Sequence, residues 1–158
     1  LSTLDLNNFD TSKVTTMKNM FSQANINTLD ISKLTTSQVQ NVEGLFSSSN
    51  IQDLNAPNLD FSKVTSLKNI FKDASIGSMD IAGWKISQVT DMTTSFSNMH
   101  RLASLSLSGW DTSKVELMEG TFSSLHSITS LNLVITAEMY ITNDATCEYS
   151  SIHLLSSR

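Results

Sequence analysis

Apolar residues recur along this chain every 25 or 26 positions, and polar residues fill the places between them. Two columns show the period independently, because both step by 25, 25, 25 and 26 residues. A period of this length is typical of a solenoid, in which each unit stacks on the next. The columns are Phe21, Phe46, Phe71, Phe96 and Phe122, and Val14, Val39, Val64, Val89 and Val115.

The repeat divides the 158 residues into five complete units, one partial unit and a segment without the pattern. The units are 1–25, 26–50, 51–75, 76–101, 102–127 and the partial 128–133. We expect residues 134–158 to form a C-terminal cap, with Met139, Tyr140 and Ile141 covering the last coil, or else a frayed tail. Because the chain starts at the first repeat position without methionine, we also expect it to be a fragment with more repeats upstream.

Each unit contains two hydrophobic periods. Leu4 and Leu6 flank Asp5, and this spacing of two predicts a short strand with one buried face. Val14, Met17 and Met20, with Phe21 directly after them, fall on one stripe of a helix, which predicts about nine helical residues near 13–21. A serine two positions before each valine is expected to be the helix N-cap; these serines are Ser12, Ser37, Ser62, Ser87 and Ser113.

Stacked units would share one core and place their strands in parallel, about 4.8 Å apart. Helices need about 8–10 Å between axes, so we expect an α/β solenoid that curves with its sheet inside. Parallel strands joined by crossovers predict a right-handed coil. Trp84 and Trp110 share the apolar column of Phe9, and we expect them in the core rather than on a carbohydrate-binding platform.

The strand positions between the apolar residues form a polar, partly acidic stripe on the predicted inner sheet. Inner sheets of solenoids often bind ligands, although a solvated face without a ligand would have the same pattern. Stacked carboxylates could also hold a cation, but no particular metal is indicated. The candidate binding residues are Thr3, Asp5, Thr28, Asp30, Asp53, Asn55, Ser78, Asp80, Ser104 and Ser106.

Composition and motifs exclude several classes of function. The net charge of −5 argues against nucleic-acid binding, and no apolar run is long enough to span a membrane. Because no catalytic motif occurs, we predict neither an enzyme nor a cofactor. His100 and His126 lie one repeat apart, which fits duplicated turn residues as well as a metal pair that lacks further evident ligands.

The runs Leu4-Asp5-Leu6, 17–21 (MKNMF) and 110–115 (WDTSKV) resemble the repeat of BspA-like leucine-rich-repeat proteins, which are surface proteins of bacteria and protists. The resemblance covers residues 1 to about 133. It implies a leucine-rich-repeat-like solenoid and an extracellular, non-enzymatic module that is often linked to adhesion. A cysteine that this repeat often carries is replaced here by Ala24, Ser49 and Ala74, so no disulfide ladder is expected.

We therefore expect a cell-surface binding or adhesion module that presents its inner sheet to a protein or glycan on a host or neighbouring cell. A structural spacer of a larger surface protein is the alternative. Ice binding is a third possibility, although acidic residues would spoil a flat ice-binding face.

Overall fold

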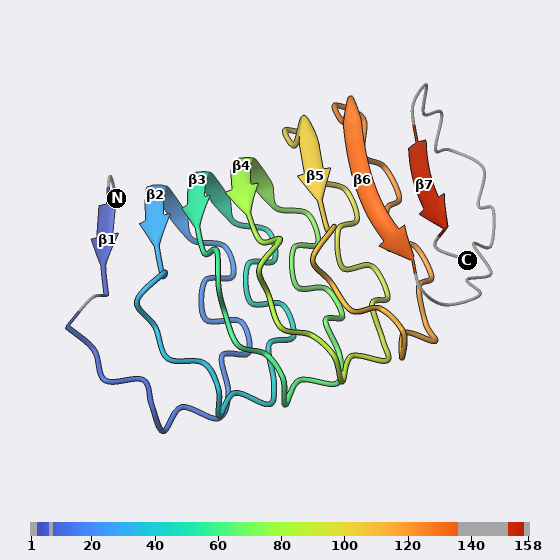
Figure 1. Ribbon diagram of the computed structural model, residues 1–158. Helices are drawn as coiled ribbons and strands as arrows, with labels where there is room; N and C mark the ends of the chain where they lie inside the picture. The colour runs from blue at the N-terminus through green and yellow to red at the C-terminus, as the bar shows by residue number, and fades with distance from the viewer. Residues whose placement is uncertain (1–2, 7, 136–151, 157–158) are drawn as a thin grey trace.

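The computed structural model describes residues 3–6, 8–135 and 152–156, with side chains as far as Asn132, as a stack of coils (Figure 1). We number the five complete units coils 1 to 5. Each coil contributes one strand, and every strand pair is parallel and joins neighbours in chain order. The strands are β1 (Thr3–Asp5), β2 (Asn25–Asp30), β3 (Asn50–Asn55), β4 (Ser75–Asp80), β5 (Ser104–Ser106), β6 (Ser130–Ile135) and β7 (Ile152–Ser156).

The predicted parallel solenoid of about five turns of roughly 25 residues is confirmed. Thr3 pairs with Thr28 and Asp30 with Asn55, a shift of one repeat in each case. The strands β1–β4 form one sheet and β5–β7 a second. The strand pairing is interrupted between β4 and β5, where coil 4 has its extra residue in the turn at 100–101. Coil 5 also has 26 residues, yet β5 pairs with β6, so the extra residue alone does not break the pairing. The predicted cap residues Met139, Tyr140 and Ile141 lie outside the described residues.

The predicted helices are wrong, because no helix lies among the described residues. In coil 1 the residues predicted to be helical, near 13–21, instead lead into successive turns. The N–H of Met20 donates to the carbonyl of Met17, and the N–H of Ala24 to that of Phe21, both three residues back. The third residue of each turn, Asn19 or Gln23, has a φ of 55° or 58°. An α-helix excludes such values, whereas a type II turn requires them.

The stack overrides the helical pattern because it offers these N–H groups partners in the next coil. Asn19 donates to the carbonyl of Glu43 at 3.0 Å, and Phe21 to that of Leu45 at 2.9 Å. Equivalent bonds run from coil 2 to coil 3 and onward, and we call this row of turns the turn face. Inter-coil hydrogen bonds therefore set the spacing on both the strand side and the turn side of each coil. The curvature was expected because helices need a wider spacing than strands, and without helices that reason no longer applies.

Three of the five serines predicted as helix N-caps, Ser12, Ser62 and Ser113, instead lie in turns capped by an aspartate. A carboxylate oxygen accepts the backbone N–H two residues later, which is an Asx turn. These pairs are Asp10 with Ser12 at 3.0 Å, Asp60 with Ser62 at 3.1 Å, and Asp111 with Ser113 at 3.1 Å.

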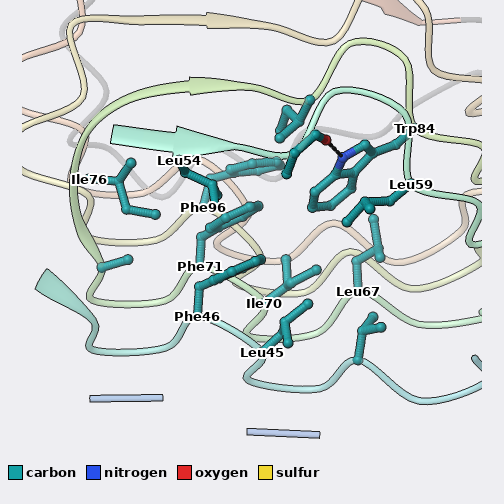
Figure 2. Packing of buried hydrophobic residues seen from close by; sticks show 14 of the residues in the cluster. Leu45, Phe46, Leu54, Leu59, Leu67, Ile70, Phe71, Ile76, Trp84 and Phe96 are labelled. Atoms are coloured by element: carbon teal, nitrogen blue, oxygen red, sulfur yellow. Dashed lines mark hydrogen bonds between the residues drawn. The ribbon is translucent and has the colours of Figure 1, made fainter. Parts of the chain in front are cut away.

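The core is a continuous row of aromatic and aliphatic side chains between the strands and the turn face (Figure 2). The five phenylalanine rings stack with centroid separations of 5.6, 5.0, 5.5 and 5.7 Å. Trp84 and Trp110 are buried, as predicted, and Trp84 donates its indole N–H to the carbonyl of Ala56 at 2.6 Å. Each coil therefore covers the core of its neighbour.

Candidate functional site

The candidate binding residues lie on the strand side of the stack, which we call the strand face. Eight of them belong to the sheet β1–β4, and Ser104 and Ser106 belong to β5 in the second sheet. Nine are exposed and Asp30 is half-buried. The fold thus places the eight residues of the first sheet in two rows: Thr3, Thr28, Asp53 and Ser78, and Asp5, Asp30, Asn55 and Asp80.

The carboxylates of the strand face are mostly separated from one another by neutral residues. Only Asp5 and Asp30 are direct register partners, since Asn55 stands between Asp30 and Asp80 in the same row. Asp53 lies in the other row and accepts a hydrogen bond from the Ser78 hydroxyl at 2.7 Å. This arrangement reduces the like-charge repulsion that would have favoured a bound cation.

Asp30 also stabilises the backbone turn at the end of β2. Its carboxylate accepts the backbone N–H of Ser32 at 2.9 Å. Hydrogen bonds from the Ser32 side chain and backbone hold the pKa of Asp30 below its ordinary value of 3.8. Asp80 approaches the backbone N–H of Ala82 at 3.4 Å, which is a weaker contact. Asp53 has no such backbone cap in the described chain, and its carboxylate instead accepts the Ser78 hydroxyl.

Sequence reasoning did not select the amide and guanidinium groups at the start of the strands. The Asn50 amide donates to the Asn25 side chain at 3.1 Å, and Arg101 reaches across coil 4 to Asn50 at 3.4 Å. The sequence could have indicated these groups, because each polar residue directly precedes the first apolar residue of a repeat, which is Ile26, Ile51 or Leu102. The strand face therefore carries carboxylates toward the ends of its strands and amides with one guanidinium toward their starts.

The two sheets differ in charge. The four aspartates lie on β1–β4, whereas β5 offers the hydroxyl groups of Ser104 and Ser106. The two serines are thus placed on the same side of the stack as the acidic residues but across the interruption in strand pairing.

The described residues contain neither a metal-binding cluster nor a membrane-spanning helix. No group of three or more His, Cys, Asp or Glu side chains there could hold a metal ion. His100 and His126 are both exposed. No helix in that part of the chain is long and apolar enough to cross a membrane.

Comparison with known proteins identifies a family and no individual relative. Neither the curated proteins nor the solved structures gave a significant match. Residues 2–78 and 65–137 each match DUF285, a family described as "Mycoplasma protein of unknown function". Because these two overlapping matches span most of the chain, the protein belongs to the DUF285 family.

Proposed function

We propose that this chain is a non-enzymatic binding module of an extracellular or cell-surface protein. In this proposal the strand face binds a protein or glycan on a host or neighbouring cell. The observation that carries it is the register of exposed polar residues over β1–β4, where Ile26, Leu29, Ile51 and Leu54 are turned into the core. The resemblance to BspA-like leucine-rich-repeat surface proteins supports the same proposal.

Charge favours a partner with hydrogen-bond donors or basic groups opposite the aspartates. Asp53 and Asp80 are exposed and lie on adjacent strands, so a partner lying across β3 and β4 would meet both. Charge complementarity of this kind mainly sets specificity and the rate of association. Its contribution should therefore weaken as the salt concentration rises.

The test reverses charge on the strand face without removing a strong backbone cap. We would measure the binding of a double variant, Asp53→Lys with Asp80→Lys, to immobilised matrix proteins, glycans and host cells. We expect at least a tenfold loss of binding and an unchanged melting temperature. The matched control is Glu116→Lys with Glu119→Lys, which makes the same charge change at exposed positions on the turn side of the coil. Equal binding by the two double variants would reject the strand face as the binding surface.

A structural spacer is the second candidate, and the unbroken phenylalanine stack favours it. Rings from all five coils are in contact, so the coils should transmit force as one continuous rod. In a longer surface protein, deletion of residues 51–75 should then shorten the reach and reduce function in proportion to length. The strand-face double variant should leave a spacer's function unchanged, which separates the two candidates.

A further inference from the structure

The backbone hydrogen bonds of the turn face are interrupted between coils 2 and 3. Parallel bridges join Thr16 to Asn41 and Ser66 to Asp91, but none joins Asn41 to Ser66. The N–H of Gln40 donates to the carbonyl of Thr15 at 2.8 Å, whereas the described chain has no equivalent bond from Thr65 to Gln40. Two neighbouring coils therefore part locally at this row.

Side-chain contacts lie on both sides of the interruption. On the coil 1 side, Lys18 Nζ lies 2.8 Å from the Glu43 carboxylate. On the coil 4 side, the Ser66 hydroxyl donates to Asp91 at 3.2 Å. Beyond this row coils 2 and 3 meet again, since the N–H of Gly44 reaches the carbonyl of Lys68 at 3.4 Å. The Phe46 and Phe71 rings of the same two coils also stack at 5.0 Å in the core.

A hollow of about 330 Å³ opens at the interruption, and we call it the turn-face hollow. All of its lining residues are polar and come from coils 2 and 3. They are Gln40, Asn41, Glu43, Thr65, Ser66 and Lys68.

The lining offers both donors and acceptors to a ligand. Asn41 uses its side-chain oxygen to accept the N–H of Glu43 at 3.0 Å, which leaves its NH₂ group available. In the described structure, the side chains of Gln40 and Thr65 and the ammonium of Lys68 have no protein hydrogen-bond partner. Lys18 offsets the charge of Glu43. The charge of Lys68 is partly offset by the Asp91 carboxylate. Burial raises the pKa of that carboxylate, but hydrogen bonds from Thr93 and Ser66, and then the charge of Lys68, lower it below its ordinary value. With both charges of the lining offset in this way, the hollow suits a neutral ligand.

We propose that the turn-face hollow is a binding site for one neutral sugar residue of a glycan. A sugar ring carries neighbouring hydroxyls that both donate and accept, and the amides, the hydroxyl and the ammonium of the lining match that pattern. At the interruption, the Gln40 carbonyl and the Thr65 N–H do not bond to each other, so the backbone adds one acceptor and one donor to those of the side chains. This site is separate from the strand face and does not depend on the function proposed for that face.

The test is a titration of the whole chain with glucose, galactose, N-acetylglucosamine or maltose. The readout is the change in backbone amide NMR shifts. We expect saturable shifts at residues 40–44 and 65–68, with weak affinity because the site is open and has few hydrogen bonds. Asn41→Ala and Thr65→Val should each weaken binding roughly tenfold. Thr15→Val is the matched control, because Thr15 holds the same repeat position in coil 1 but does not line the hollow.

Three results would overturn the proposal. The first is an absence of saturable shifts with all four sugars, and the second is saturable shifts that lie on the strand face instead. The third is binding of inorganic phosphate, but not of sugars, that disappears in Lys68→Ala, since this would make the hollow an anion site. If Asn41→Ala does not fold, the exposed Gln40→Ala replaces it, because the Gln40 side chain has no protein hydrogen bond in the described structure.

Discussion

Coil 1 and coil 3 carry the same motif but differ greatly in burial. Phe9 in coil 1 is 66% exposed, while Leu59 at the same repeat position in coil 3 is 2% exposed. Met20 in coil 1 is 47% exposed, and its equivalent Ile70 is fully buried. Coil 3 lies between two described coils and coil 1 next to only one. The difference shows that burial in this fold is set by neighbours, as nearest-neighbour stability requires.

The largest expected effect comes from removing a ring in coil 3. Phe71 stacks on Phe46 at 5.0 Å and on Phe96 at 5.5 Å, so Phe71→Ala should lower the free energy of unfolding by about 3–5 kcal/mol. Denaturant titration monitored by circular dichroism would measure this loss. Phe9→Ala in coil 1 is the control and should cost less than about 0.5 kcal/mol, as for other exposed positions. Equal losses would contradict the neighbour rule.

The next effect concerns the left-handed residue of the first turn. Gly44 has a φ of 62°, and a Cβ added there would meet the side chain of Asn19. Gly44→Ala should therefore cost about 1–3 kcal/mol in thermal or denaturant unfolding. The opposite change is available in the second turn of coil 1, because Gln23 is an exposed residue with a φ of 58°. Gln23→Gly should be neutral or stabilising by up to about 1 kcal/mol, and a clear loss there would show that the side chain matters more than the turn.

Acid should weaken coil 3 through Asp60. Hydrogen bonds from the Ser62 side chain and backbone hold the pKa of Asp60 below its ordinary 3.8, and Lys85 lies 3.5 Å away. A carboxylate whose pKa is lowered by folding stabilises the folded state at pH values above its pKa in the unfolded chain. That stabilisation is lost as the pH falls from about 4 through the pKa of the folded state. We expect the free energy of unfolding of Asp60→Asn to decrease slightly less between pH 5 and pH 2 than that of the parent protein.

The comparison for this acid effect is Asp10→Asn in coil 1. Asp10 makes the same Asx turn through Ser12, and its pKa is lowered by the same hydrogen bonds, but it is fully exposed and no ion pair joins it in the described structure. Asp10→Asn should therefore change the pH profile less than Asp60→Asn does. A parent protein whose stability does not change below pH 4 would remove the basis for both expectations.

The smallest expected effect is a gain. Ser49 is 1% exposed, and its hydroxyl has no hydrogen-bond partner in the described structure. Since an unsatisfied buried hydroxyl destabilises, Ser49→Ala should raise the free energy of unfolding by up to about 1 kcal/mol. Calorimetric melting would measure the shift. Ala24 in coil 1 and Ala74 in coil 3 already hold alanine at this position, so a marked loss of stability would mean that the hydroxyl has an unseen partner.

The sequence predicted the stack, the strands and the core columns, because the period places one apolar set under the next. It failed on the helices, since the spacing of Val14, Met17 and Met20 also fits successive turns. A second signal was present at the position of Asn19, which is held by Gly44 and Gly120 in other coils. Asparagine and glycine favour a positive φ, and this column argues for turns rather than a helix.

The candidate sites were predictable to different degrees. Alternation around Asp5 and Asp30 was enough to predict the exposed strand positions, because alternate side chains of a strand face opposite ways. The Asx cap at Asp30 could have been suspected from the following Ser32, but its geometry could not. The turn-face hollow could not be predicted, because it lies where the backbone pairing of coils 2 and 3 is interrupted, and the repeat pattern is the same at paired and unpaired coils.

The hydrogen bonds from Asn19 to Glu43 and from Phe21 to Leu45 give the turn face an electrical direction. These N–H groups point toward the following coil and outnumber those, such as the N–H of Gln40, that point back, so the peptide dipoles of the turn face do not cancel fully. The end at coil 1 then presents carbonyl oxygens and a partial negative charge. This polarity is opposite to that of an α-helix, whose amino end is positive. A cationic group placed at the coil 1 end would therefore be favoured where a helix would favour an anion.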